Sequence, residues 1–204
     1  MDQSIVVSAL LGAIQGLTEF LPVSSSGHLT IFQHLFGLQD PESNLALDIL
    51  LHSATLLAVI WFFRADLWVF ATADGRARPE NRRLALLVLV ASIPTAVIGL
   101  GFKKKFEALF GAPLIVCCAL VATGVLLLAA HWQARRQAGG GIGELSLGHA
   151  LFIGILQGIA ITPGISRSGS TIAAGIFSGM KGEEAGRFSF LLMIVSVGGA
   201  TLLE

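Results

Sequence analysis

Two segments of the chain read QGLTEFLPVSSSGH (Gln15–His28) and QGIAITPGISRSGS (Gln157–Ser170), at an offset of 142 positions. Identical residues at this offset include Gln15 and Gln157, Ser24 and Ser166, Ser26 and Ser168, and Gly27 and Gly169. Both segments lie in strongly apolar surroundings. Irregular backbone is tolerated at membrane depth only where protein buries it or where it lines a cavity. We therefore expect these two loops to form a functional site.

The composition is that of an integral membrane protein. Hydrophobic residues make up 54% of the chain and charged residues 13%, whereas soluble domains carry about 25% charged residues. The net charge of zero argues against a nucleic-acid partner. Cys117 and Cys118 are adjacent, and this spacing suits neither a disulfide nor a shared metal. The fold class that follows is an all-α, polytopic membrane protein.

Apolar segments of two kinds follow one another along the chain. Unbroken runs of spanning length are expected at Leu45–Phe63, Leu84–Gly101 and Pro113–Trp132, and a fourth starts near Phe188 and continues to the end. Two other segments, Ile5–Phe36 and Leu147–Gly179, are each two short apolar pieces separated by a Pro/Gly/Ser loop. The broken segments predict two re-entrant helical hairpins, each entering and leaving on one side of the membrane.

The basic residues predict the orientation. With both hairpins re-entrant, nine basic residues fall on one side: five Arg in Arg64–Arg83, then Arg135, Arg136, Lys181 and Arg187. Only Lys103–Lys105 fall on the other side, so the side with nine is expected to be cytoplasmic. Three spans separate the hairpins, and this odd number inverts the second one. The pattern predicts an inverted-topology repeat whose loops meet near the midplane.

The repeat divides the chain into three parts. Residues 1–136 form the first copy, residues 137–146 a glycine-rich linker, and residues 147–204 a second, shorter copy. The difference in length leads us to expect that one or two spans of the second copy are missing from the C-terminus.

Glu19 is the first candidate for chemistry, because a carboxylate in an apolar segment is costly and usually functional or paired. Gln15 lies one helical turn earlier on the same face. Together they could bind a divalent cation, which prefers oxygen ligands. The alternative is a glutamate that caps nearby backbone amides.

The loop after Glu19 supplies hydroxyl groups and a histidine. Ser24, Ser25 and Ser26 stand before a second apolar run, where serine hydroxyls and helix N–H groups suit an anion. Gly27 permits an unusual backbone angle. Ser25 is a candidate nucleophile, and His28 a candidate base or acid. The alternative is a serine N-cap followed by an interfacial histidine.

Arg167 is the one arginine within either loop, and its planar fork suits bidentate binding of phosphate. Ser166, Ser168 and Thr171 could donate further hydrogen bonds around it. The alternative is an arginine that reaches the cytoplasmic surface.

Asp48 and His52 are spaced four residues apart on the first expected span. They could orient Glu19 or His28 from behind, or Asp48 could be solvated at the outer interface.

These motifs resemble those of the bacterial undecaprenyl-diphosphatase family, which is also linked to bacitracin resistance. The resemblance rests on Gln15-Gly-Leu-Thr-Glu19, the PVSSSGH loop and the PGISRSG loop from Pro163 to Gly169, and it covers essentially the whole chain. Gln15 stands where many members of the family have Glu.

The resemblance implies removal of the terminal phosphate of undecaprenyl diphosphate in the bacterial inner membrane, with Mg²⁺ or Ca²⁺ as cofactor. It assigns catalytic roles to Glu19, Ser25, His28 and Arg167, and substrate contacts to Ser166 and Thr171. We expect Gln15, Ser24, Ser26, Gly27, Ser168 and Gly169 to bind the substrate with them. The resemblance agrees with an inverted repeat, and it leaves a homodimer open.

The expected mechanism is in-line attack on the terminal phosphorus by Ser25 or by water, with His28 as proton carrier. The positive-inside pattern places the Glu19 loop on the periplasmic side, and the lipid tail would lie between spans. The main alternative is a lipid-phosphate flippase or an ion-coupled transporter, because broken helices at the midplane are also typical of transporters.

Overall fold

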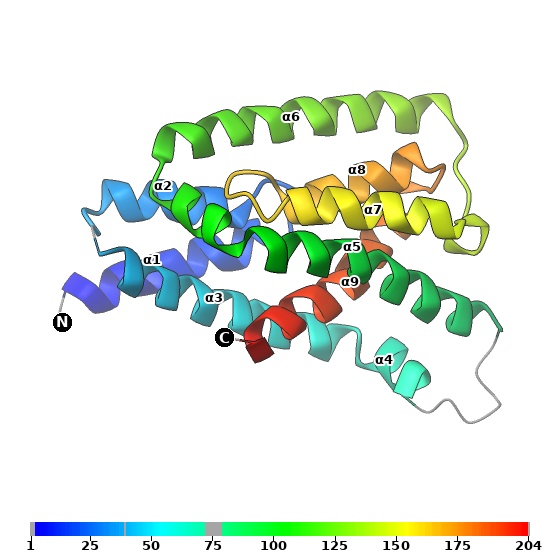
Figure 1. Ribbon diagram of the computed structural model, residues 1–204, viewed down its shortest axis with the longest axis horizontal. Helices are drawn as coiled ribbons and strands as arrows, with labels where there is room; N and C mark the ends of the chain where they lie inside the picture. The colour runs from blue at the N-terminus through cyan, green and yellow to red at the C-terminus, as the bar shows by residue number, and fades with distance from the viewer. Residues whose placement is uncertain (1–2, 39, 72–78, 204) are drawn as a thin grey trace.

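The computed structural model describes residues 3–38, 40–71 and 79–203, and these form a bundle of helices (Figure 1). Within these ranges no β-strand occurs, and one isolated bridge joins Gly140 to Met180. The elements in chain order are α1 Gln3–Thr18, α2 Ser25–Leu35, α3 Pro41–Phe62, α4 Arg64–Ala71, α5 Pro79–Phe110, α6 Pro113–Arg136, the 3₁₀ helix Ile142–Glu144, α7 Leu147–Ile159, α8 Arg167–Phe177 and α9 Gly182–Leu203.

Each of the two broken segments is a helix, a short irregular stretch and a second helix. Helices α2 and α8 have the same length of 11 residues and begin 142 positions apart. Both are capped in the same way, because Ser24 Oγ accepts from Gly27 N at 3.3 Å and Ser166 Oγ accepts from Gly169 N at 3.0 Å. The N-cap hydroxyl satisfies an amide that the first helical turn leaves free, so the same local chemistry starts both helices.

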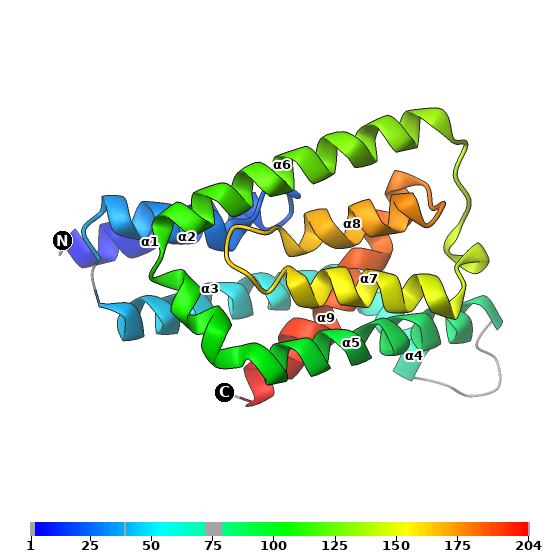
Figure 2. The ribbon, with the colours of Figure 1, turned by 45° about the horizontal axis from the view of Figure 1, so that its top comes forward.

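The two hairpins point toward each other. Figure 2 shows α1–α2 extending from one end of the molecule and α7–α8 from the opposite end, with their irregular stretches in the middle. A Cβ on Gly27 would lie 3.0 Å from the Cα of Gly164, and one on Gly169 would lie 3.1 Å from the carbonyl oxygen of Pro22. Glycine is therefore needed at these positions because the two backbones cross in contact.

Among the described residues, three helices are long and apolar enough to cross a membrane: Ser43–Phe62, Arg82–Phe110 and Pro113–Arg136. They confirm the three unbroken spans expected from the sequence. The fourth expected span lies on α9, whose last residues have side chains outside the described part of the chain. Helix α5 continues well beyond Gly101, with Pro94 inside it and non-helical angles at Phe102, so Lys103–Lys105 lie on a helix.

The outer surface of the spans is apolar. Trp61 and Leu114 keep 71% and 78% of their accessible surface. So much exposed apolar area is unusual for a soluble protein. We therefore infer that the hydrocarbon of a lipid bilayer surrounds these helices.

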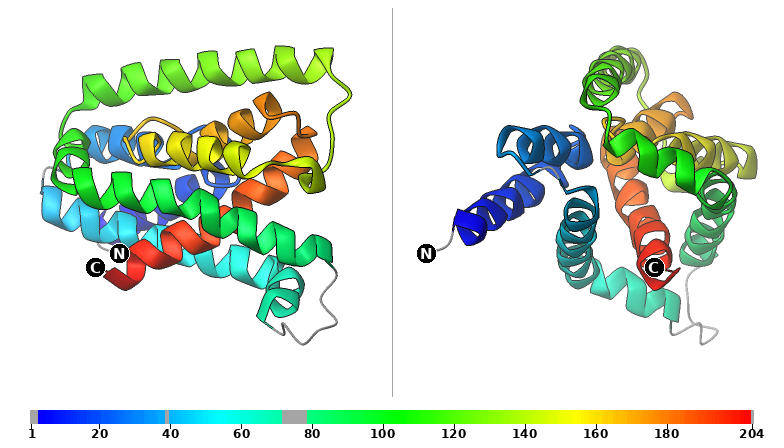
Figure 3. Two further views of the ribbon diagram at one scale, coloured as in Figure 1. Left: turned by 45° about the vertical axis from the view of Figure 1, so that its right-hand side comes forward. Right: turned by 60° about the vertical axis from the view of Figure 1, so that its left-hand side comes forward.

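Helix α9 passes through the middle of the bundle, where it packs against α3, α5 and α8 (Figure 3). Phe188 and Leu192 on this helix are fully buried. The apolar core around α9 therefore packs the long helices α3 and α5 against the second hairpin.

Helices α5 and α7 are in extensive contact along their lengths. Gly154 and Gly158 form a Gly-x-x-x-Gly pattern on α7, and a Cβ on Gly154 would lie 2.7 Å from the Cγ of Pro94. Small residues let two membrane helices approach and exchange polar contacts. Here Thr95 Oγ1 donates to the carbonyl of Gly154 at 2.9 Å.

The two expected connecting regions have structure of their own. The Arg64–Arg83 segment begins with α4, and residues 72–78 lie outside the described residues. The linker at 137–146 packs against the end of α8, because Gly140 N donates to Gly179 O at 2.7 Å and Gln137 Nε2 donates to Ile176 O at 2.6 Å.

Candidate active site

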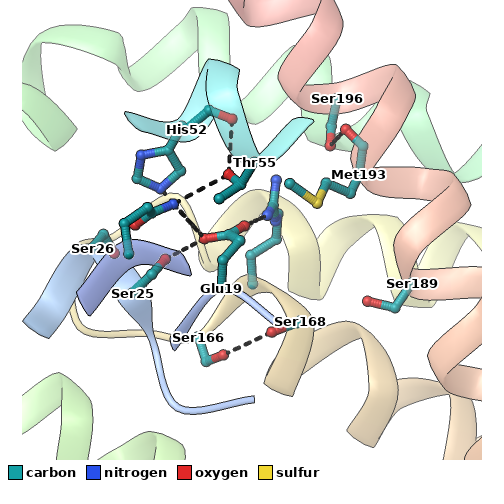
Figure 4. A network of polar contacts seen from close by, with 12 residues as sticks. Glu19, Ser25, Ser26, His52, Thr55, Ser166, Ser168, Ser189, Met193 and Ser196 are labelled. Carbon is teal, nitrogen blue, oxygen red and sulfur yellow. Dashed lines mark hydrogen bonds and ion pairs between the residues drawn. The ribbon is translucent and has the colours of Figure 1, made fainter. Parts of the chain in front are cut away.

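The carboxylate of Glu19 is the centre of the polar network (Figure 4). Glu19 follows the end of α1 and is 4% exposed. One of its oxygens, Oε1, accepts a hydrogen bond from the guanidinium of Arg167. The other, Oε2, accepts from Ser25 Oγ and from Gln15 Nε2, the latter at 3.1 Å.

The partners of this carboxylate come from both hairpins. Ser25 is the first residue of α2, and Arg167 is the first residue of α8. A helix N-terminus carries partial positive charge and free N–H groups. Two helix N-termini and one guanidinium thus surround a single carboxylate, and this arrangement suits an anionic ligand.

His52 on α3 also reaches Glu19, with Nε2 3.6 Å from Oε2. Its other ring nitrogen, Nδ1, lies 2.8 Å from the backbone carbonyl of Asp48. A carbonyl can only accept, so Nδ1 carries a hydrogen and the ring is held with Nε2 toward Glu19. The sequence placed His52 behind Glu19 or behind His28, and the structure places it against Glu19.

Asp48 is buried, at 5% exposure, and its Oδ1 accepts from Gln33 Nε2 at 2.7 Å. It is therefore held inside the bundle, one turn before His52.

The serines beside the two helix starts form matching pairs. Ser24 and Ser26 place their hydroxyl oxygens 3.4 Å apart, and Ser166 and Ser168 place theirs 3.3 Å apart. Ser24 has φ 66°, the one positive φ among the described non-glycine residues. Such angles are costly and cluster at functional sites.

A cavity of about 490 Å³ lies in front of this network. Its polar lining includes Glu19, Ser25, His52 and Arg167, together with Ser24, Ser26, Ser166 and Ser168. Apolar residues of α3, α5 and α9 form other parts of the wall, including Ile49, Leu100, Phe106 and Val195. A charged group and an apolar chain can therefore be held in one space.

Five of the expected site residues do not line the cavity, and one of them, Gln15, is buried where it donates to Glu19 and Thr55. His28 is half-buried, and its Nδ1 lies 2.8 Å from the carbonyl of Ser24. Thr171 is fully buried, and its hydroxyl lies 2.6 Å from that of Ser189 on α9. Gly27 and Gly169 stand at the crossing of the hairpins.

Two threonines that hold this site, Thr55 and Thr123, do not stand out in the sequence. Thr123 on α6 accepts from Ser166 N and donates to Gly164 O, both at 3.0 Å, so it fixes the second loop. Thr55 accepts from Gln15 Nε2 at 3.4 Å. The available signal was an isolated threonine in an apolar span, where a hydroxyl needs a partner.

The residues around Glu19 fit a divalent cation that is shared with a phosphate ligand. Gln15 Oε1 is buried and has no hydrogen-bond partner among the described residues. An amide oxygen and a carboxylate are hard oxygen ligands, and Mg²⁺ is commonly held by one or two carboxylates plus substrate phosphates. Within the described ranges no group of three or more His, Cys, Asp or Glu is placed to hold a metal, so any protein ligands here would include amide oxygens.

Comparison with known proteins gives one matching family and several similar proteins. The family model described as bacitracin resistance protein BacA matches residues 8–204. A protein of Desulfosudis oleivorans named undecaprenyl-diphosphatase is 48% identical, over 98% of this chain and 76% of its own length. Relatives with the same name in Desulfatibacillum aliphaticivorans and Rubrobacter xylanophilus are 46% and 42% identical, over 75% and 74% of their lengths.

The match covers the α1–α2 loop, the α7–α8 loop and all the spans between them. The chain therefore belongs to the family of the bacitracin resistance protein BacA.

Proposed function

We propose that this protein hydrolyses undecaprenyl diphosphate to undecaprenyl phosphate and inorganic phosphate. The relatives bear the name of this enzyme. The observation that carries the proposal is the Glu19 carboxylate, which binds a serine hydroxyl from one hairpin and an arginine from the other in a partly apolar cavity. A lipid-phosphate transporter is not favoured, since it needs no serine oriented by a carboxylate.

Ser25 is the candidate nucleophile. Its hydroxyl donates to Glu19, so the carboxylate is placed to take the proton as Ser25 Oγ bonds to the terminal phosphorus. The bond from that phosphorus to the bridging oxygen breaks, and undecaprenyl phosphate leaves with the electron pair. Water then hydrolyses the phosphoserine and releases inorganic phosphate. In the direct version, water replaces Ser25 as the attacking group.

Arg167 is the candidate phosphate ligand. It is paired with Glu19 and partly exposed to the cavity. An incoming phosphate can take up the free donors of its fork, and the N–H groups at the start of α2 and α8 add to the positive field. These fixed donors stabilise charge that develops on the terminal phosphate.

We assign the cation, Mg²⁺ or Ca²⁺, to the oxygens of Glu19 and Gln15. When bound, it would neutralise the diphosphate and polarise a phosphoryl oxygen. Glu19 takes the first proton, and His28, which does not line the cavity, remains our candidate proton carrier for the later hydrolysis step. His52 is the histidine that contacts Glu19 directly.

We infer an inverted-topology repeat with two re-entrant hairpins in the inner membrane, and a site that opens to the periplasmic side. The matching bounds of α2 and α8 and the opposite directions of the hairpins support this topology (Figure 2). The excess of basic residues on the other side supports the orientation.

The test is release of inorganic phosphate from a prenyl diphosphate by detergent-solubilised protein, with and without EDTA. We expect cation-dependent release that Arg167→Ala abolishes and that Arg135→Ala, at the exposed end of α6, leaves intact. No release by the folded, unsubstituted protein would favour the transporter instead, because a micelle offers no membrane to cross.

A further inference from the structure

Gln157 on α7 is a buried polar residue that the chemistry above does not use. It is 1% exposed and lines the cavity that also contains Glu19 and Arg167. At the offset of 142 positions it is the counterpart of Gln15, which is also 1% exposed.

The amide of Gln157 can be oriented in only one way. Thr95 Oγ1 has a single hydrogen, and its neighbours are the carbonyls of Gly154 at 2.9 Å and Ala91 at 3.2 Å, which can only accept. Toward Gln157, Thr95 must therefore accept. Gln157 Nε2 donates to it at 3.1 Å, so the amide oxygen Oε1 points away from Thr95.

The counterpart in the first hairpin is held by the same logic. Thr55 Oγ1 donates to the backbone carbonyl of His52 at 2.9 Å, so it accepts from Gln15 Nε2. Glu19 accepts from the same nitrogen. In both glutamines, Nε2 donates to a threonine hydroxyl. Each Oε1 is buried without a partner among the described residues.

An amide oxygen held in this way repels the oxygens of a phosphate and binds a cation or a hydrogen-bond donor. We propose that Gln157 Oε1 is a ligand of the divalent cation that accompanies the diphosphate. This inference rests on the proposed function, because the proposed reaction is what requires the cation. The second hairpin then contributes a cation ligand as well as the arginine, and its ligand type is the hard oxygen that Mg²⁺ and Ca²⁺ prefer.

Binding of Mn²⁺ to detergent-solubilised protein, followed by loss of the free-ion EPR signal, tests this without any turnover. We expect Gln157→Leu to weaken Mn²⁺ binding about tenfold or more, the range typical of groups that support a metal site. Gln157→Glu adds a charge and should tighten binding. Gln137→Leu is the matched control, because the amide of Gln137 is satisfied by Gln133 and Ile176 and does not line the cavity.

Unchanged Mn²⁺ affinity in both Gln157 variants, or no saturable binding by the unsubstituted protein, would overturn the inference and leave a solvent water as the partner of Oε1. Should Gln157→Leu fail to fold, Gln157→Glu decides alone, since an added carboxylate at a cation ligand must change the affinity. Altered Mn²⁺ binding in a protein that releases no phosphate would count against the proposed reaction and not against this ligand.

Discussion

At the scale of single residues, Glu19 is a buried charge that has been compensated from several directions. Arg167 supplies the opposite charge, and Ser25 and Gln15 supply hydrogen bonds. Removing one partner of a buried ion pair is far more costly than replacing both. Single and double replacements of Glu19 and Arg167 should therefore separate the effect of the pair on stability from its effect on activity.

We expect Arg167→Met to lower the free energy of unfolding by about 3–5 kcal/mol, because Glu19 is left buried without its cation. Adding Glu19→Gln should restore most of that loss while activity stays absent. Thermal unfolding in detergent measures both. Glu107→Gln, which breaks the exposed Lys103–Glu107 pair, is the control and should cost less than about 1 kcal/mol. A double variant no more stable than Arg167→Met would contradict the pairing.

Ser25→Ala should lower kcat by about 10⁴–10⁶, the range expected for loss of a serine nucleophile, with little change in KM. The control is Ser53→Ala, because the Ser53 hydroxyl donates to the carbonyl of Ile49 on its own helix. Steady-state phosphate release measures the effect. Full activity of Ser25→Ala would eliminate the phosphoserine route and leave direct attack by water.

At the scale of elements, glycines decide how closely the helices and loops approach. Gly164 has φ 92°, which side chains rarely adopt, and a Cβ there would lie 2.8 Å from the Cβ of Ala119. Thr123, one turn later on α6, then holds the loop through its two hydrogen bonds. The position of Arg167 depends on this loop.

Gly154→Ala should destabilise the protein by about 1–3 kcal/mol, because the added methyl group meets Pro94 and the backbone of α5. Gly124→Ala on α6 is the matched control. A methyl group on Gly124 would have no atom within 4 Å, so replacing this helical glycine should stabilise by about 0.5–1 kcal/mol. Thermal unfolding of the two variants side by side gives the comparison, and equal effects would mean that α5 and α7 are not in close contact.

At the scale of the whole molecule, the site depends on two hairpins that come from opposite ends and meet in the middle (Figure 2). The chain spans about three quarters of the length of the relatives it matches. The three long spans between the hairpins bring together side chains that are 148 positions apart, as the Arg167–Glu19 pair shows.

The inferred topology predicts which side a label can reach. In a background with Cys117 and Cys118 replaced by Ser, Lys104→Cys should react with a membrane-impermeant maleimide added to intact cells. Arg135→Cys should react only after the inner membrane is permeabilised. Both positions are exposed, so reactivity reports the side. The reverse pattern would turn the site toward the cytoplasm.

By itself, the sequence determined the membrane class, the three unbroken spans and the two helix–loop–helix breaks. These depend on local composition, on apolar run length and on Pro, Gly and Ser at the breaks, and each is a short-range property of the chain. It also identified Glu19, Ser25 and Arg167, because charged and hydroxyl groups are conspicuous in apolar surroundings.

Only the tertiary structure decided which groups meet. It placed His52 rather than His28 against Glu19 and Thr171 against Ser189 of α9. It also brought Thr123 to the second loop and Thr95 to Gln157. Such contacts join helices far apart in the chain, and they depend on crossing positions that helical periodicity does not contain. The orientation of the glutamine amides followed from the same packing, since it is the neighbouring helix that determines which hydrogen-bond partner each amide finds.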